Sequence, residues 1–456
     1  MKHHTYKKKT KINVPVDILF HWHERKGAVL RLTPPWSSIK LVEKKRQGIK
    51  KGVRVKFIIK FFKIPFIWES EHTTYQKNKI FKDEQIKGPF SQWKHTHIFK
   101  SLDASSSIME DKIEFKLPFG FLLKPFYRPV KKALERIFNY RHNILKYDLE
   151  NLIDIKQNKR ILISGASGTI GNALVPFLQT RGYEVIRLVR KKPESLDEIF
   201  WDPYKNILDL ENKGRFDAVI SLNGVDISRG RWTNKQKELI INSRLIPTKF
   251  ILSKIKNLKN RPEVFICASA IGFYGDSKDK ILTETSNSGD CFISNVCELW
   301  EKEAMATDKK LARTVNLRIG IVFTPFGGII KRMSFLFKLG LGLRLSHGRQ
   351  YMSWISIDDV LSSILFILNN KKIFGPVNLT APEPVTNQEF SNTLGKVFSK
   401  KVFFYMPKFL IKLIWGQMGK EILLSGARVF PKKLLDNGFS FRYKKLFLSL
   451  KDMFGR

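Results

Sequence analysis

Cysteine, acidic residues and long apolar runs are scarce in this sequence, and each shortage excludes a class of protein. The 456 residues include three cysteines, too few for the disulfide framework of a secreted domain. No apolar run approaches the ~20 residues that cross a bilayer, and the first residues lack the apolar stretch of a signal peptide. Hydrophobic residues still make up 43% of the chain, which excludes a disordered protein. We therefore expect a folded protein without a transmembrane segment, located in the cytoplasm.

The shortage of acidic residues produces a large positive charge. There are 41 Asp and Glu against 82 Lys and Arg, a net charge of +41. Residues 1–150 hold 33 basic and 14 acidic residues, and the other 306 residues hold 49 and 27. A nucleic-acid-binding protein usually concentrates its excess in one tail or stripe. We therefore expect a solvated basic surface and no specific nucleic-acid partner, with contact to a polyanion or membrane surface as the open alternative.

Residues 1–150 alternate apolar and polar positions over short runs. Val53–Phe57 and Lys112–Leu117 have the period of two that indicates strands. From Pro129 to about Leu145, apolar residues recur at helical spacing, and proline suits the first turn of a helix. Strands followed by one long helix predict an α+β domain in which a sheet wraps a helix. The polar residues 151–159 are interpreted as a linker.

Histidine also separates this region from the rest, because eight of the nine histidines lie in residues 1–150. His21/His23 and His95/His97 are each two residues apart, a spacing that places both side chains on one face of a strand. Four imidazoles that met could bind zinc. No cysteine is near them, and nothing in the sequence requires the two pairs to meet. We therefore expect hydrogen-bonding or pocket histidines and no metal site, with zinc as the open alternative.

After Lys159 the pattern changes to strands that alternate with helices. The expected strands are Arg160–Ser164, Tyr183–Val189, Phe216–Leu222 and Val264–Ala268. A helix is expected up to Leu178, and a second over Lys235–Ile255. This alternation predicts an α/β Rossmann fold, a doubly wound parallel sheet, over residues 160–375.

A glycine-rich segment joins the first of these strands to the first helix. It reads Gly165-Ala166-Ser167-Gly168-Thr169-Ile170-Gly171. Glycine lets the backbone turn tightly and approach a pyrophosphate, and the helix amino terminus offers free amides. We predict a dinucleotide site whose cofactor-binding residues are Gly165, Ser167, Gly168, Thr169, Ile170 and Gly171.

The residue after the second strand indicates which dinucleotide binds. An acidic residue there would accept the ribose hydroxyl of NAD, but this chain has Arg190. A guanidinium pairs with a 2′-phosphate and stacks on adenine. The sequence therefore predicts NADP (NADPH) as the cofactor.

Ten short segments between residues 160 and 450 resemble those of a known protein family. They are Gly165–Gly171, Trp201–Pro203, Arg231–Thr233, Ser243–Arg244, Ser269–Gly275, Leu317–Val322, Gly348–Tyr351, Trp354–Asp359, Leu423–Val429 and Pro431–Leu434. With them the chain resembles the atypical extended short-chain dehydrogenase/reductases (SDR) of the epimerase-like family 39U type. The resemblance implies a small C-terminal domain, over residues 376–456, that completes the substrate side.

The resemblance also implies site residues. Leu222, Asn223 and Gly224 are expected to line the cofactor, although the family pattern there is N-L-A-G and this chain has Ser221 at its start. Arg318 is expected to border the nicotinamide.

An active SDR normally has a Y-x-x-x-K pair, in which the lysine lowers the pKa of the tyrosine. At the corresponding positions this chain has Ile293 and Cys297. The polar candidates that remain are Ser269, at the end of a strand, and Tyr274 in the following turn. They are our catalytic candidates. Without a neighbouring lysine we expect the pKa of Tyr274 to stay near ~10, so that its phenol donates a proton and turnover is slow.

The first 150 residues resemble a different family. Phe20–Ala28, Leu32–Trp36 and Gly88–His97 are similar to SRPBCC, or START-like, ligand-binding modules, which are helix-grip folds around an apolar cavity. Together the two resemblances imply an NADP-binding epimerase or oxidoreductase that acts on a small-molecule substrate, with an apolar ligand held by the N-terminal module. The alternative is a non-catalytic, NADP-bound sensor or assembly protein. We expect a monomer or a homodimer.

Overall fold

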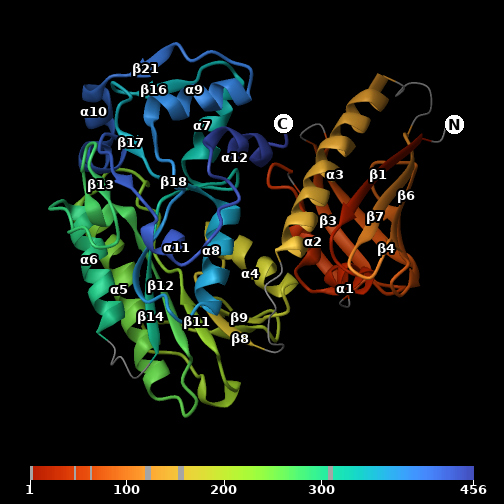
Figure 1. Ribbon diagram of the computed structural model, residues 1–456, viewed down its shortest axis with the longest axis horizontal. Helices are drawn as coiled ribbons and strands as arrows, with labels where there is room; N and C mark the ends of the chain where they lie inside the picture. The colour runs from red at the N-terminus through yellow and green to blue at the C-terminus, as the bar shows by residue number, and fades with distance from the viewer. Residues whose placement is uncertain are drawn as a thin grey trace. The chain divides into compact units, whose positions relative to one another are not determined.

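The computed structural model describes residues 4–37, 39–45, 48–61, 64–118, 125–151, 159–306 and 312–456. The chain divides into two compact units (Figure 1). The first consists of Met1–Gln157, Pro176–Tyr183 and Asp452–Arg456, and the second of Asn158–Val175 and Glu184–Lys451. Most of the predicted linker, residues 151–159, lies outside the described residues. The domain boundary expected at residue 375 falls within the second unit and stays a prediction.

The first unit contains a seven-stranded antiparallel sheet in the order β1-β7-β6-β5-β4-β3-β2. Its strands are β1 (His4–Ile12), β2 (Lys40–Lys45), β3 (Arg54–Phe61), β4 (Ile64–Gln76), β5 (Ile80–Lys87), β6 (Gln92–Ser101) and β7 (Ser107–Lys116). Two short helices, α1 (Val16–Glu24) and α2 (Ala28–Arg31), connect β1 to β2. The predicted strands at 53–57 and 112–117 are confirmed as parts of β3 and β7.

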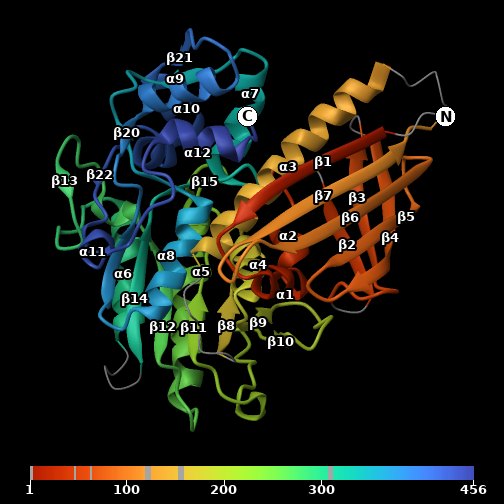
Figure 2. The same ribbon diagram turned by 45° about the vertical axis from the view of Figure 1, so that its right-hand side comes forward.

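One long helix, α3 (Tyr127–Glu150), packs on this sheet beside β1 (Figure 2). Val130, Leu134 and Phe138 recur every four residues and therefore share one face of the helix. They are buried against apolar residues of three strands, which are Tyr6, Trp93, Ile113 and Phe115. The predicted helix is confirmed, but it is longer than expected at both ends. The helix-grip assignment stays a prediction, because what is observed is the antiparallel sheet and its packed helix.

The second unit is organised around a seven-stranded parallel sheet in the order β10-β9-β8-β11-β12-β14-β19. Its strands are β8 (Arg160–Ser164), β9 (Glu184–Val189), β10 (Glu198–Phe200), β11 (Ala218–Ser221), β12 (Val264–Ala270), β14 (Arg313–Ile319) and β19 (Gly375–Leu379). The order reverses direction at β8, as in a Rossmann sheet, so that β8 and β11 lie side by side at the switch point. The predicted α/β Rossmann fold is confirmed.

Helices cover the sheet on both sides. The main ones are α4 (Thr169–Thr180), α5 (Asn234–Lys256), α6 (Phe292–Met305), α7 (Gly328–Lys338) and α8 (Ile357–Asn369). Helices α5 and α6 pack through Ile251 and Trp300 onto the apolar core at Leu162 and Phe265, whereas α8 lies on the other side of the sheet (Figure 1). Apolar residues run almost continuously along each strand because both faces of the sheet are buried.

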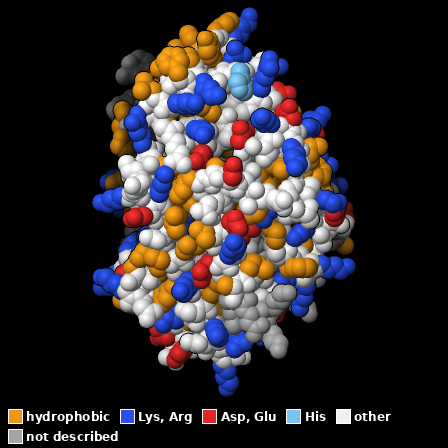
Figure 3. All heavy atoms as spheres, turned by 90° about the vertical axis from the view of Figure 1, so that its left-hand side faces the viewer, with side chains coloured by type: hydrophobic (Ala, Val, Ile, Leu, Met, Phe, Trp, Pro, Cys, Tyr) orange, Lys and Arg blue, Asp and Glu red, His pale blue; other side chains and the backbone are white. Residues whose placement is uncertain are grey.

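The rest of the second unit consists of short elements. They are the strands β13 (Ile281–Leu282), β15 (Ile321–Phe323), β16 (Leu343–Leu345), β17 (Tyr351–Met352), β18 (Trp354–Ser356), β20 (Val385–Thr386), β21 (Phe404–Met406) and β22 (Arg428–Val429) with the helices α9 (Asn387–Val397), α10 (Lys408–Met418), α11 (Lys432–Asp436) and α12 (Leu446–Met453). Among the described residues, no helix is both long enough and apolar enough to span a membrane. On the face drawn in Figure 3, lysine and arginine side chains are scattered among acidic and apolar ones and form no stripe.

Candidate functional site

The predicted phosphate loop connects β8 to α4. Gly165 has a φ of +74°, and a Cβ atom there would lie 2.4 Å from the backbone oxygen of Leu222. A Cβ atom at Gly171 would lie 2.4 Å from the oxygen of Gly165. Both positions therefore require glycine, one for the turn and one for the close packing of the helix against it.

The middle of this loop is exposed. Ser167, Gly168 and Thr169 all face solvent at the amino terminus of α4, and Ile170 is half-buried. A Cβ atom at Gly168 would meet only one described atom within 4 Å, the oxygen of Gly165 at 3.2 Å. Open space over free amides at a helix amino terminus is the environment that binds a pyrophosphate.

A second loop, after β11, lies beside the glycine loop. The backbone N–H of Leu222 donates to the oxygen of Ser164 over 3.0 Å. The side-chain amide of Asn223 donates to the hydroxyls of Ser164 and Ser221, at 2.7 and 2.9 Å. Gly224 has a φ of +145°, a backbone conformation that favours glycine. The structure thus brings Leu222, Asn223 and Gly224 to the switch point, where dinucleotides bind in open α/β sheets.

Arg190 follows the last residue of β9 and is exposed. It makes no hydrogen bond or ion pair with any residue that the structure describes. Its neighbour Lys191, in contrast, lies 2.5 Å from a carboxylate oxygen of Glu194. The guanidinium of Arg190 is therefore available to a ligand at this edge of the sheet.

Arg318 lies elsewhere, because it is only 4% exposed at the end of β14. Its guanidinium makes two hydrogen bonds of 2.8 Å to the carboxylate of Glu301 and one of 2.9 Å to the hydroxyl of Tyr274. It also lies over the ring of Phe273, 3.5 Å from its centroid. The guanidinium binds protein groups, so bordering the nicotinamide stays a prediction for this residue.

The two catalytic candidates belong to the same cluster. The hydroxyl of Ser269 donates to Glu301 over 2.7 Å. The hydroxyl of Tyr274 lies 2.7 Å from the amide oxygen of Asn378 and 3.0 Å from the backbone oxygen of Thr283. We define Ser269, Tyr274, Glu301 and Arg318 as the buried polar cluster, in which every member contacts another.

The pKa of Tyr274 departs from the sequence-based expectation. Burial raises the pKa of the phenol above its usual value, although the charge and the hydrogen bond of Arg318 act in the opposite direction. The expectation of an unshifted pKa near ~10 is therefore wrong, because it considered only the missing lysine and not the desolvation of the phenol. The consequence is the same, since the phenol is protonated at neutral pH.

The positions of the usual tyrosine and lysine are occupied by packing residues. Ile293 and Cys297 are buried on α6 in an apolar cluster with Trp232, Ile240 and Met418. Burial raises the pKa of the Cys297 thiol to about 12, so the sulfur carries no charge at neutral pH. Neither residue can replace the acid–base pair.

Sequence reasoning did not assign Glu301, the residue that holds the buried polar cluster together. A signal was present, because Arg318 stands between the apolar residues Leu317 and Ile319. A buried guanidinium requires a carboxylate partner. The sequence contains 41 Asp and Glu, however, and nothing in it indicated which of them would be that partner.

The N-terminal histidines follow two different patterns. His21 and His23 are on helix α1, where a spacing of two does not place both side chains on one face as it would on a strand. His21 is exposed, 3.1 Å from Glu24, whereas Nδ1 of His23 lies 2.9 Å from the backbone oxygen of Leu19. Burial and then the nearby His97 lower the pKa of His23 to about 3.

His95 and His97 are on strand β6 and contact acidic residues that the sequence analysis did not select, Asp83 and Asp111. Burial alone would lower the pKa of His95, but hydrogen bonds and charges from these two carboxylates outweigh it and raise the pKa to about 9.

Comparison with known proteins places this geometry in a family. Residues 161–379 match the NAD dependent epimerase/dehydratase family, and residues 406–453 match a domain of unknown function. An epimerase family protein of Mycobacterium bovis is 36% identical over 289 residues, which are 63% of this chain and 95% of that protein.

Two solved structures extend the comparison. A nucleoside-diphosphate sugar epimerase from Corynebacterium glutamicum, 28% identical, matches with a TM-score of 0.81 over 99% of this chain and 90% of its own. The human epimerase family protein SDR39U1, solved with NADPH, is 29% identical and has a TM-score of 0.60 over 65% of this chain and 99% of its own. The epimerase-like resemblance is therefore confirmed, and the SRPBCC resemblance stays a prediction. The chain belongs to the NAD dependent epimerase/dehydratase family.

Proposed function

We propose that this protein binds NADP(H) at the carboxyl edge of its parallel sheet and acts as an epimerase or oxidoreductase on a small-molecule substrate. The observation that carries the proposal is the exposed glycine loop at the switch point, with Arg190 exposed after the neighbouring strand β9 and unpaired among the described residues. The family match and the NADPH with which the human relative was solved support the choice of cofactor.

The residues at this edge fit a dinucleotide phosphate. The amide of Gly168 donates to the oxygen of Gly165 over 3.0 Å, whereas glycine at 165 and 171 keeps the loop closed against its own helix and leaves the amides of Ser167 and Thr169 at the surface. These amides bind the pyrophosphate, and Arg190 binds the 2′-phosphate. When bound, the nicotinamide would supply or accept the hydride.

The buried polar cluster supplies the proton chemistry in this proposal. The hydroxyl proton of Ser269 is directed at Glu301, so the serine oxygen presents lone pairs and would accept a hydrogen bond from a substrate hydroxyl. Arg318 donates to the phenol oxygen of Tyr274, which favours loss of the phenol proton to a substrate oxygen. That proton now faces Asn378 or Thr283, so a substrate must displace one of these acceptors. Slow turnover follows.

The second candidate function is a non-catalytic NADP-bound sensor or assembly protein. The observation that favours it is the packing of Ile293 and Cys297 into an apolar cluster where the acid–base pair is usual. The hydroxyl of Tyr274 already hydrogen-bonds to protein groups, which also favours a non-catalytic role. Its partners are Arg318, Asn378 and Thr283.

For the N-terminal unit we propose an SRPBCC, or START-like, module that holds an apolar ligand. The long helix packed on an antiparallel sheet supports this proposal. Mass spectrometry of small molecules released from the purified full chain tests it. Recovery of a stoichiometric apolar compound supports the module, and a ligand-free preparation contradicts it.

One experiment separates the two candidate functions. NADPH consumption is followed with the full chain and with apolar carbonyl compounds extracted from the source cells. Turnover that requires the protein supports the enzyme. Tight NADPH binding without turnover on any extract supports the sensor, and failure to bind NADPH contradicts both.

A further inference from the structure

Four side chains meet on one face of the antiparallel sheet in the first unit. In the register of β5 and β6, Asp83 pairs directly with His95. In the register of β6 and β7, His97 pairs directly with Asp111. Because paired residues share a face and His95 and His97 are two apart, these four side chains project from the same side of three adjacent strands.

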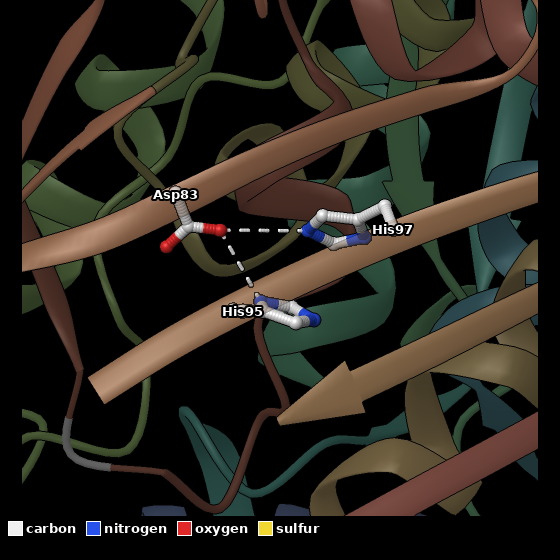
Figure 4. A group of neighbouring side chains, drawn as sticks. All are labelled: Asp83, His95 and His97. Atoms are coloured by element: carbon white, nitrogen blue, oxygen red, sulfur yellow. Dashed lines mark ion pairs between the residues drawn. The ribbon is translucent and has the colours of Figure 1, made fainter. Parts of the chain in front are cut away.

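Each imidazole directs one ring nitrogen toward Asp83. Nδ1 of His95 lies 3.3 Å from Oδ2 of Asp83, and Nε2 of His97 lies 3.6 Å from the same oxygen (Figure 4). One ligand atom from each of the three residues falls within 4.8 Å of the others. Tetrahedral zinc with ligands at about 2.0–2.1 Å separates neighbouring ligand atoms by about 3.4 Å, so small side-chain movements would bring all three to one ion.

The other nitrogen of each ring is directed toward Asp111. Nε2 of His95 lies 3.0 Å from Oδ1 of Asp111, in a hydrogen bond. Nδ1 of His97 lies 2.7 Å from the same oxygen but at an angle that makes no hydrogen bond. A small rotation of this ring would align the N–H with Asp111, and a metal ion bound at Nε2 would hold that rotation. Histidines that bind metals almost always donate their second N–H to a carboxylate in this way.

Asp111 is itself held in position. Its second oxygen, Oδ2, lies 2.8 Å from Nε2 of His142, and Nδ1 of that ring lies 2.8 Å from the hydroxyl of Thr10. The carboxylate that orients the two imidazoles is therefore fixed from α3 and β1. The side chain of Asp83 is 15% exposed, and those of His97 and His95 are 11% and 7% exposed. The Asp83 end of the group is thus the one that an ion can reach from solvent.

We propose that Asp83, His95 and His97 bind one divalent transition-metal ion of the zinc class, and that Asp111 orients both imidazoles as a positioning residue. Two imidazoles and one carboxylate are ligands that Zn²⁺ accepts. Three protein ligands leave a fourth position for water or for an oxygen atom of a ligand. The site lies in the first unit and does not depend on the proposed NADP function.

The test uses the full chain without an affinity tag, freed of metal by a chelator and then titrated with Zn²⁺ by calorimetry. Co²⁺ is added in parallel, because a site with nitrogen and oxygen ligands gives it visible absorption bands. We expect one Zn²⁺ per chain, Co²⁺ bands that Zn²⁺ abolishes, and a higher thermal unfolding temperature with Zn²⁺. Neutralising one ligand in Asp83→Asn should weaken Zn²⁺ binding by at least ~100-fold, and Asp111→Asn by about 10- to 100-fold.

His21→Gln is the matched control, because this exposed histidine is in the same unit and outside the group. It should bind Zn²⁺ as the parent does. If the Asp83→Asn protein does not fold, the Zn²⁺ stoichiometry and the Co²⁺ absorption bands of the parent protein test the proposal without it. Absence of stoichiometric Zn²⁺ binding by the parent overturns the proposal and leaves a metal-free ion-pair network. Equal binding by a folded Asp83→Asn protein overturns it as well.

Discussion

The cofactor edge and the buried polar cluster belong to the same unit but satisfy their polar groups in opposite ways. At the cofactor edge, formed by the glycine loop and Arg190, the residues Ser167, Thr169 and Arg190 are exposed, and Arg190 has no hydrogen-bond or ion-pair partner among the described residues. In the cluster, Ser269, Tyr274 and Arg318 are each at most 4% exposed and bond to one another or to Glu301. A surface that binds a ligand leaves groups unpaired, whereas a group that stabilises a fold does not.

This difference bears directly on function. The exposed loop has the features that we propose for dinucleotide binding, whereas the polar residues that we propose for proton transfer form a closed hydrogen-bond network. The four predictions that follow test this difference between the two regions.

The largest effect is expected from Gly168→Val. The branched side chain would fill the open space over the loop and prevent the pyrophosphate from reaching the backbone. NADPH binding, followed by fluorescence titration, should be abolished, while the thermal unfolding of the N-terminal unit is unchanged. Ser167→Ala, next to it and equally exposed, serves as the control and should bind nearly normally. Binding by the valine variant within a few-fold of the parent would give the loop another role.

Glu301→Ala should strongly destabilise the second unit. It leaves the buried guanidinium of Arg318 without its carboxylate, a loss of about 3–5 kcal/mol for a buried pair. Urea unfolding of the parent and the variant measures it. Glu298→Ala removes an acidic residue from the same helix, one that pairs with Lys302 near the surface, and should have a much smaller effect. Similar losses in the two variants would show that the cluster is not a stabilising network.

Tyr274→Phe separates catalysis from stability in the same cluster. If the protein turns over a substrate, removal of the phenol proton should lower kcat by roughly 10²-fold with little change in NADPH affinity. Ser269→Ala should act in the same direction, more weakly. Because burial raises the pKa of Tyr274, the phenol stays protonated in alkaline solution and kcat of the parent should be level from about pH 7 to about pH 9. Full turnover by the phenylalanine variant would remove Tyr274 from the mechanism.

The smallest effect is expected at Arg190. Arg190→Ala removes one charge-assisted contact to a phosphate and should weaken NADPH binding about tenfold to a hundredfold while NADH binding is unchanged. Lys192→Ala, also exposed and two residues away, controls for the loss of one positive charge. Equal affinities of the parent for NADPH and NADH would contradict the NADP assignment.

Much of the fold could be predicted because its strands and helices follow from local sequence patterns. The strand Arg160–Ser164 is found with the predicted bounds, and the helix expected over Lys235–Ile255 differs by one residue at each end. The strand is a short apolar run that a glycine ends, and the helix begins after Thr233, whose side chain caps it, so local features decided both elements. The pair His21/His23 shows the opposite case, because a spacing of two does not distinguish a strand from one turn of a short helix.

The position of the glycine-rich loop was predictable for a related reason. A glycine-rich turn between a strand and a helix is a local feature, and its position at the switch point follows from the order of the strands. The expected monomer or homodimer and the cytoplasmic location, in contrast, stay predictions.

The sequence by itself determined the alternation of strands and helices and the glycine-rich turn, because each depends on residues close together in the chain, and the family resemblance located Ile293 and Cys297 where a tyrosine–lysine pair is usual. Only the tertiary structure decided that Glu301 pairs with Arg318, 17 residues apart, and that Asp83 and Asp111 flank the same two histidines. The physical reason is the same in both units. A buried charge must find a partner, but which carboxylate lies within reach depends on strand register and helix packing, which act across separate segments of the chain.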